Sequence, residues 1–228
     1  MPYTIHTIRL ALPFHMSVVN CYLLDTGAGF VLIDTGGSNR RAELLRALEA
    51  AGCASGDLCL VVLTHGDFDH SGNAAHLRQA FSTLVALHPG DAAAVERGDM
   101  FGGRKKGNPL FRALTPLLFG FGRRDRFTPD IRVEDGYPLA AFGLDARVLC
   151  MPGHSSGSIG VLTAAGDLFC GDMFTNDAAP ALNTLIDDPA AAEASLDRLE
   201  CLEIGTVYPG HGQPFTMEQF LSEHRLSG

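Results

Sequence analysis

The sequence predicts a mixed α and β fold, and two patterns carry that prediction. Apolar runs of strand length alternate with stretches whose leucines recur at helical spacing, and some adjacent apolar runs are joined by short hairpin-like turns. The chain has 228 residues, of which 46% are hydrophobic, so it can bury a large core. Because hairpins accompany the alternation, a simple doubly wound sheet is not expected.

The first third of the chain predicts strands and helices in turn. "NCYLLDTGAGFVLIDTGG" (20–37) has two apolar runs around a Thr-Gly-Ala-Gly turn, which indicates a β-hairpin. "NRRAELLRALEAAG" (39–52) has leucines at helical spacing and ends at a glycine, as helices often do. "LCLVVLT" (58–64) is a short continuous apolar run, as expected of a buried strand. A helix at 74–81 and a strand at 83–89 are expected to follow.

Residues 96–135 interrupt this rhythm. Glycines and prolines punctuate the segment, and it combines a basic cluster with an apolar stretch. We therefore expect a lid or insertion here. Strands at 145–154, 158–174 and 206–212 and a helix at 189–202 are predicted after it.

The bulk properties narrow the class of protein. The net charge of −9 argues against nucleic acid as the main partner. No apolar run reaches the roughly 18 residues of a transmembrane helix, so no transmembrane segment is expected, and the N-terminus lacks the pattern of a signal peptide. The six cysteines form no CxxC pair, which favours reduced thiols and a cytoplasmic location.

Metal-capable side chains recur where apolar runs end. His65, His154, Asp172 and His211 each follow such a run after a small or turn residue. If the four runs share one sheet edge, these side chains converge there. A single such histidine is more often a hydrogen-bonded core or loop residue, and Asp69 alone could be a helix N-cap.

The stretch "THGDFDH" (64–70) strengthens the case for a metal site. Two histidines and two aspartates lie within six positions, and burying them together is costly unless a cation neutralises the carboxylates. Mixed imidazole and carboxylate ligands suit Zn, Fe or Mn.

The motifs "THGDFDH", "PGHSSGS", "GDMF" and "YPGHG", in that order, resemble those of the metallo-β-lactamase superfamily, specifically its hydrolase branch with glyoxalase II-like enzymes. The match runs from Asp34-Thr35-Gly36 to His211. The resemblance implies an α+β fold, a four-layer αββα sandwich with the metal site at one edge between the two sheets. It also implies a single domain over residues 1–228, with the lid or insertion at 96–135.

The resemblance implies two divalent metal ions, although some members of the family hold one. Residues carried over by position are His65, Asp67 and His154 for the first metal, Asp69, His70 and His211 for the second, and Asp172 as the bridge.

Asp67 departs from the family pattern HxHxDH. A carboxylate is shorter and harder than an imidazole, so it could bind the first metal and shift the preference from Zn toward Fe or Mn. It could also fall short and leave that site weak or filled by water. Zn and Fe/Mn both remain open.

The function implied is a metal-dependent hydrolase, in which a metal-activated hydroxide attacks a thioester, lactone or phosphoester. Asp69 would ligate the second metal and orient the nucleophile. One alternative is an oxidoreductase resembling persulfide dioxygenases, with a mononuclear iron held by His65, His154 and Asp172. Another is a metal-binding protein without turnover. Candidates to hold the ligand histidines, or to play plain structural roles, are Ser155, Ser156 and Asp34.

The partner is expected to be a small-molecule substrate, anionic or acyl in character. Arg104, Lys105 and Lys106 could contact its phosphate or carboxylate. The interleaved leucines and phenylalanines of 97–132 could line an acyl pocket, form a homodimer contact or touch a membrane surface. A solvated charged face over a packing helix is the simpler reading of the same residues.

Overall fold

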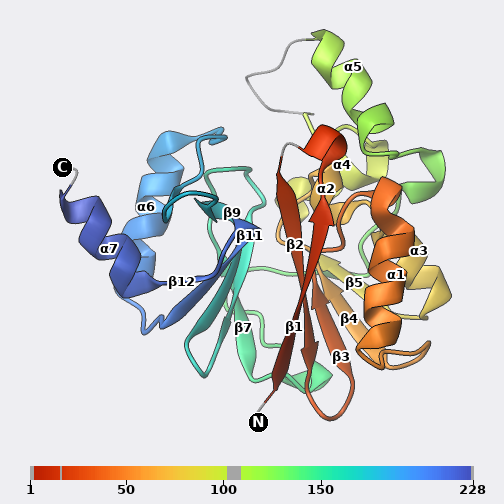
Figure 1. The fold of residues 1–228 in the computed structure, drawn as a ribbon, viewed down its shortest axis with the longest axis horizontal. Coiled ribbons are helices and arrows are strands. Elements are labelled where there is room, and N and C mark those ends of the chain that lie inside the picture. Colours follow the sequence, from red (N-terminus) through yellow and green to blue (C-terminus); the bar gives the residue numbers. More distant parts are fainter. Residues whose placement is uncertain (1–2, 16, 102–108, 227–228) are drawn as a thin grey trace.

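The computed structural model, which describes residues 3–15, 17–101 and 109–226, has helices on both outer sides of its strands (Figure 1). The strands of the first half are β1 (Thr4–Ala11), β2 (Val18–Asp25), β3 (Phe30–Ile33), β4 (Leu58–Val62), β5 (Leu84–Leu87) and β6 (Ile131–Arg132). Those of the second half are β7 (Ala146–Cys150), β8 (Ile159–Thr163), β9 (Asp167–Asn176), β10 (Ala181–Leu182), β11 (Thr206–Gly212) and β12 (Phe215–Thr216).

Helices connect these strands and cover them. The α-helices are α1 (Arg41–Ala50), α2 (Phe68–Ser71), α3 (Ala74–Ala80), α4 (Pro89–Arg97), α5 (Pro109–Leu118), α6 (Pro189–Glu200) and α7 (Met217–Leu226). Short 3-10 helices are η1 (Pro13–His15), η2 (Ser38–Arg40), η3 (Arg123–Asp125) and η4 (Ala140–Phe142). Figure 1 shows α1 and α3 outside the first half of the strands and α6 and α7 outside the second.

The strands of the described residues hydrogen-bond in the order β6-β5-β4-β3-β2-β11-β9-β8-β7, with β1, β10 and β12 paired to β2, β9 and β11. The two halves meet at a narrow point, because β2 and β11 pair through His211 and Val19 alone. From β3 to β6 the pairs are parallel, whereas β2 pairs antiparallel with β3. The joint between the halves therefore lies at a predicted metal ligand.

Alternation along the strands builds three separate apolar cores. In β2, Cys21 and Leu23 pack in a core with α1 and α3, whereas Tyr22 and Leu24 pack in a core with strands of the second half. In β9, Phe169 joins that middle core. A third core packs the other face of the second half against α6 and α7. Because successive side chains of a strand point to opposite faces, each half has one face on its helices and one on the other half.

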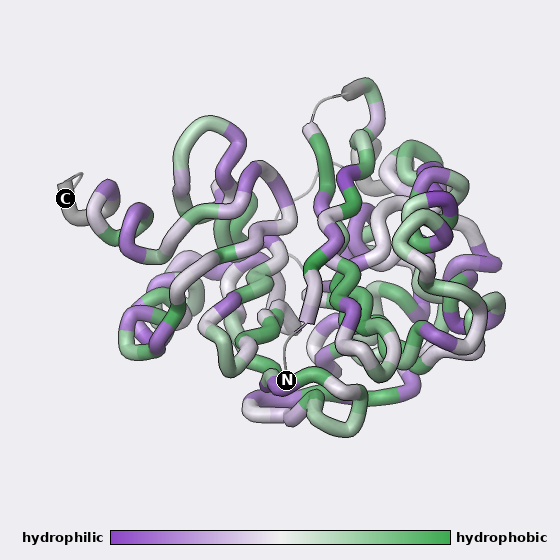
Figure 2. Tube along the Cα trace, turned by 60° about the horizontal axis from the view of Figure 1, so that its bottom comes forward, coloured by the Kyte–Doolittle hydropathy of each residue, from purple (hydrophilic) through white to green (hydrophobic). Residues whose placement is uncertain are grey.

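Three cores separate four layers, in the order helix, sheet, sheet, helix. Figure 2 shows the hydrophobic colouring running along the central strands, while the outer helices alternate between the two colours. The predicted four-layer α+β sandwich is confirmed.

The predicted elements of the first third are present, including the hairpin of β2 and β3 and the helix α1. The structure adds β1, α4 and α7, which the patterns considered had not predicted. Segment 96–135 contains α5, η3 and β6, and α5 exposes Leu117 to 77%. Its basic residues Arg104, Lys105 and Lys106 lie outside the described residues, so their role in substrate binding stays a prediction.

Candidate metal centre

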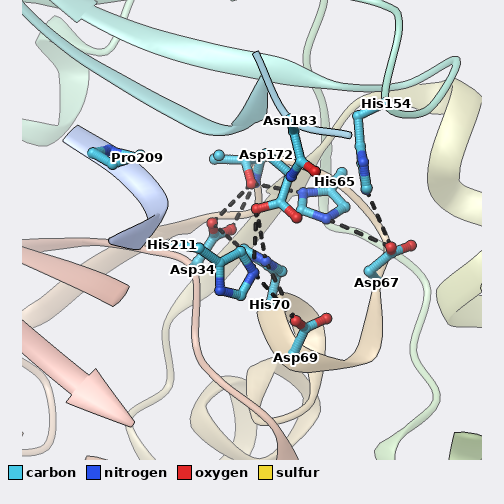
Figure 3. Close-up of polar contacts among 12 residues, drawn as sticks. Asp34, His65, Asp67, Asp69, His70, His154, Asp172, Asn183, Pro209 and His211 are labelled. Atoms are coloured by element: carbon cyan, nitrogen blue, oxygen red, sulfur yellow. Dashed lines mark hydrogen bonds and ion pairs between the residues drawn. The ribbon is translucent and has the colours of Figure 1, made fainter. Parts of the chain in front are cut away.

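Five segments bring the predicted ligands to one place (Figure 3). His65 and Asp67 follow β4, and Asp69 and His70 lie on the short helix α2. The other three ligands come from the second half of the sandwich. His154 follows β7, Asp172 lies within β9, and His211 lies within β11.

The first donor group consists of His65, His154 and Asp172. One ligand atom from each lies within 4.8 Å of the others. Asp67 lies beside this group, since its Oδ2 is 3.2 Å from Nε2 of His154 and 3.8 Å from Nε2 of His65. A carboxylate at position 67 therefore reaches the place where the sequence predicted a ligand.

The second donor group consists of Asp69, His70 and His211, again with one ligand atom from each within 4.8 Å of the others. Oδ2 of Asp69 is 3.5 Å from Nε2 of His211 and 3.8 Å from Nε2 of His70. Asp69 lies inside α2, so it does not cap the following helix α3, whose N-cap residue is Asn73.

Asp172 stands between the two groups. Its Oδ1 is 3.3 Å from Nε2 of His70 and 3.5 Å from Nε2 of His211, although the residue also belongs to the first donor group. The rings of His65 and His70 are 4.1 Å apart between centroids, which places the two groups side by side. The arrangement is that expected of a bridging carboxylate.

Backbone carbonyls orient two of the four histidines. Nδ1 of His154 lies 2.6 Å from the carbonyl oxygen of Leu185, and Nδ1 of His211 lies 2.9 Å from that of Val18. A carbonyl can only accept, so each Nδ1 carries the proton. Each Nε2 then faces the cluster and can offer its lone pair to a metal when it carries no proton.

Asp34 orients the other two histidines. Its Oδ2 is 2.8 Å from Nδ1 of His70 and also accepts the hydroxyl hydrogen of Thr64 at 2.8 Å. Since that hydroxyl donates to Asp34, Oγ1 of Thr64 accepts from Nδ1 of His65 at 2.9 Å. With Nδ1 held in this way, Nε2 of His65 and of His70 faces the cluster and can bind a metal when it carries no proton.

Several polar atoms of the centre have unmet bonding capacity. Among the described residues, the buried atoms Nε2 of His65, Nε2 of His70 and Oδ1 of Asp172 make no well-aligned hydrogen bond, although the last two lie 3.3 Å apart. A buried polar atom without a partner is costly. A divalent cation would satisfy these atoms and neutralise the carboxylates, so the donor set fits a metal.

Charges within the cluster shift its pKa values in both directions. Burial, together with the neighbouring rings of His70 and His154, lowers the pKa of His65 well below its usual value, so His65 is neutral. Burial alone would lower the pKa of His70, but the carboxylates of Asp172 and Asp34 outweigh it and raise that pKa well above normal. Burial would also raise the pKa of Asp172, yet His211 and His70 hold it well below its usual range.

Glycine allows the second half of the sandwich to approach the centre. A Cβ on Gly210 would lie 2.5 Å from Oδ1 of Asp172 and 2.8 Å from Cε1 of His70. The strand β11 shifts register against β9 on both sides of Pro209, next to this glycine. The irregularity explains why Asp172 and His211 lie within strands and still converge with the loop ligands.

Of the three residues predicted to hold the ligand histidines, only Asp34 contacts one of them. Asp34 contacts His70 as expected, but the hydroxyl of Ser155 bonds to Asp91 and that of Ser156 to the carbonyl of Gly90. The partners that sequence reasoning missed are mostly backbone carbonyls, for which side-chain identity gives no signal. Thr64 alone had a signal, because it directly precedes His65.

A cavity of about 300 Å³ opens beside the centre. Asp67 lines it from the side of the metal groups, and the beginnings of α4 and α6 line it from the other sides through Gly90 and Ala191. Such a cavity is of the size that holds small ligands.

Among helices in the described part of the chain, none is both long and apolar enough to cross a bilayer.

A model of the family described as the metallo-beta-lactamase superfamily matches residues 16–211. Among curated proteins, the chain is 31% identical to human metallo-beta-lactamase domain-containing protein 1, over 90% of this chain and 66% of that protein. It thus spans about two thirds of the length of the human relative.

Bacterial relatives include enzymes named as hydrolases. The chain is 29% identical to the probable metallo-hydrolase YqjP of Bacillus subtilis, over 96% of this chain and 75% of that one. It is 30% identical to the hydroxyacylglutathione hydrolase GloC of Haemophilus influenzae, over 63% of this chain and 60% of that one.

Solved structures share the fold. TTHA1623 in a di-iron-bound form has a TM-score of 0.69 and 29% identity, covering 92% of this chain and 96% of that one. The archaeal metallo-beta-lactamase superfamily protein ST1585 from Sulfolobus tokodaii has a TM-score of 0.72 and 22% identity, covering 97% of this chain and 85% of that one.

Proposed function

The chain belongs to the metallo-beta-lactamase superfamily, and from this premise we propose that it is a hydrolase with two metal ions that cleaves a thioester, lactone or phosphoester. Members of this superfamily are mostly hydrolases that bind divalent metals. The names of the YqjP and GloC relatives support hydrolysis, and that of GloC supports a thioester-like substrate class.

One observation carries the proposal: two donor groups lie side by side with Asp172 between them, and all four imidazoles turn Nε2 toward the cluster. We assign His65, Asp67 and His154 to the first metal, Asp69, His70 and His211 to the second, and Asp172 to both. When bound, divalent cations would lower the pKa of a coordinated water toward about 7 and polarise a substrate oxygen.

The protein residues contribute orientation and charge. Asp69 would bind the second metal through Oδ2, near His211, and orient the attacking water through its other carboxylate oxygen. The Nδ1 bonds of His154 and His211 to carbonyls would hold both rings in place during turnover. The substrate would enter through the cavity beside Asp67.

Metal identity and location complete the proposal. We propose Zn or Fe/Mn, since Asp67 adds a hard oxygen ligand beside the first donor group and the structural relative TTHA1623 was solved in a di-iron form. The six cysteines are free in the structure, which supports a reducing compartment such as the cytoplasm.

The proposal is tested by metal analysis together with a panel of thioester, lactone and phosphoester substrates. Protein expressed without metal supplementation should hold two metal ions per chain and hydrolyse one of these classes. His70→Ala should lose metal and most of the activity, while His76→Ala, on the adjacent helix α3, should keep both. Unchanged metal content and rate in His70→Ala would contradict the assignment.

A second function is favoured by a specific arrangement. His65, His154 and Asp172 form a two-histidine, one-carboxylate group, the ligand set of mononuclear iron oxygenases. A single iron per chain with oxygen uptake would favour that oxidoreductase over the hydrolase. Metal binding without either activity across the panel would indicate a metal-binding protein without turnover.

A further inference from the structure

We propose that Asp91 is a positioning residue for the first metal, because its buried carboxylate ties the loop of His65 and Asp67 to the loop of His154. This inference rests on the proposed metal-binding function of the same centre. It adds a residue that lies about twenty positions from the nearest ligand motif in the sequence.

Asp91 bonds to both ligand loops at once. The residue lies in the first turn of α4 and is 7% exposed. Its Oδ2 accepts the backbone N–H of Gly66 at 2.8 Å, between the two ligands His65 and Asp67. The same atom accepts the hydroxyl of Ser155 at 2.7 Å, and Oδ1 accepts the N–H of Gly157 at 3.0 Å. Both oxygens are therefore occupied by loops that carry first-metal ligands.

Both loops are shaped to fit against Asp91. A Cβ on Gly157 would lie 2.5 Å from the backbone nitrogen of Asp91 and 2.7 Å from its Oδ1. A Cβ on Gly66 would lie 2.9 Å from Cβ of Ala94 and 3.1 Å from the carbonyl oxygen of Asp91. Only glycine allows either loop to come this close, so the contacts with Asp91 are built into both motifs.

The carboxylate does not serve its own helix. The N-cap of α4 is His88, whose Nδ1 accepts the N–H of Gly90 at 3.1 Å. Asp91 instead directs its side chain away from the helix to the loops. Its oxygens are filled by protein donors, so we assign it a positioning role and not a place in the chemistry.

Loss of Asp91 should loosen the loops without separating the sheets. The strand ends that carry the loops are joined independently, because the N–H of Ile159 donates to the carbonyl of Thr64 at 2.8 Å. Asp91 fixes the loop segments beyond that bond, where His65, Asp67 and His154 project. Groups that orient metal ligands typically change metal affinity by roughly 10- to 100-fold when removed.

The test is a metal titration of chelator-treated protein with Zn²⁺ or Co²⁺, which measures the affinity of each of the two sites. Asp91→Ala should weaken one site by roughly 10- to 100-fold and leave the other close to wild type. Asp91→Asn keeps the volume but turns an N–H donor toward a loop donor, so it should weaken the same site. Ser155→Ala removes one of the three bonds and should cause a smaller loss there.

Two comparisons identify the affected site. In a His154→Ala background, which lacks a first-metal ligand, Asp91→Ala should cause little further loss of metal affinity. In a His211→Ala background, which lacks a second-metal ligand, Asp91→Ala should still weaken metal binding. Asp130→Asn is the matched control, because Asp130 pairs with Arg78 and the backbone of Val85, remote from the ligand loops. It should lower thermal stability without changing either metal affinity.

Two results would overturn the inference. One is that Asp91→Ala binds metal at both sites with wild-type affinity. The other is an equal loss of affinity at both sites, which would indicate only a general structural role. If Asp91→Ala does not fold, Asp91→Asn and Ser155→Ala decide by the same criterion. Wild-type protein that binds two metals but hydrolyses no substrate would refute the proposed function and leave this inference standing. Wild-type protein that binds no metal would refute both.

Discussion

The carboxylate of Asp34 lies 2.8 Å from Nδ1 of His70, and the same oxygen accepts the hydroxyl of Thr64, which in turn holds His65. One aspartate thus orients a histidine of each donor group. Asp34 is buried, with a backbone φ of 60°, a left-handed conformation that aspartate and asparagine tolerate better than most residues. Asp34, which directly follows β3 of the hairpin, therefore helps to orient the ligand histidines of the metal centre.

Asp34→Asn should weaken metal binding by roughly 10- to 100-fold. Asparagine suits the left-handed backbone, but if its oxygen replaces Oδ1, which accepts the backbone N–H of Thr64 at 2.8 Å, its amide nitrogen replaces Oδ2 and donates toward Nδ1 of His70. The ring must then present a protonated Nε2 to the metal. Calorimetric titration of chelator-treated protein checks this. Retention of wild-type affinity at both sites would show that Asp34 does not set the ring tautomer.

Gly210→Ala should disrupt the centre while the sandwich still folds. The added Cβ would displace Asp172 or His70, since it would lie 2.5 Å from the carboxylate oxygen of Asp172. Such overpacking costs about 1–3 kcal/mol of folding stability. Metal content should fall below that of Gly205→Ala, the matched control, whose Cβ would meet no atom closer than 3.8 Å. Equal metal content in both variants would contradict the predicted close approach.

Asp67→His should change the metal preference of the first site. The imidazole replaces a hard carboxylate whose Oδ2 is 3.2 Å from Nε2 of His154. In competition with equal concentrations of Zn²⁺, Fe²⁺ and Mn²⁺, the variant should hold a larger fraction of zinc than the wild type. Metal analysis of the dialysed proteins checks this. An unchanged ratio would mean that Asp67 does not ligate directly.

The metal-free protein should lose stability as the pH rises. Burial by itself would lower the pKa values of His70 and His211. Nearby carboxylates, Asp172 foremost, outweigh burial and raise both pKa values well above normal. A raised pKa in the folded state gives stability that is complete below the unfolded value of about 6.5 and is lost as the pH rises through the folded value. Denaturant unfolding of chelator-treated protein should therefore give a lower free energy of unfolding at pH 9 than at pH 7.

The same protons compete with metal, so metal affinity should rise over that pH range. His65 contributes nothing to the fall, because its pKa is lowered and it stays neutral above about pH 6.5 in both states. His70→Ala is the control and should show a smaller fall in stability. A stability that increases from pH 7 to pH 9 in metal-free wild type would contradict the charged state assigned to His70.

Sequence patterns predicted the convergence of the ligands because strand ends are readable. The apolar runs before His65 and His154 end in loops, and a sheet gathers such strand ends at one edge, whereas the Pro-Gly step before His211 lies at a register shift inside β11. The four-layer order followed from the resemblance and not from periodicity. Alternation in β2 alone does not say which side faces helices and which faces another sheet.

The residues that orient the metal ligands could not be predicted from the sequence in the same way. Leu185 and Val18 act through carbonyl oxygens that every residue has, and Asp91 looks in the sequence like an ordinary residue of a helix start. Ser155 adjoins His154 in sequence yet bonds to Asp91. Contacts of this kind depend on which loops the packed sheets bring together, and so they emerge only in three dimensions.

The central claim is that two adjacent groups of side chains bind metal, and anomalous X-ray diffraction at the metal absorption edge tests it most directly. Crystals of metal-loaded protein should show two anomalous peaks. With zinc bound, one should lie at about 2.0–2.1 Å from Nε2 of His65 and of His154, and the other at a similar distance from Nε2 of His70 and of His211. Full-occupancy peaks only at other places, or none in crystals grown with excess metal, would contradict the account.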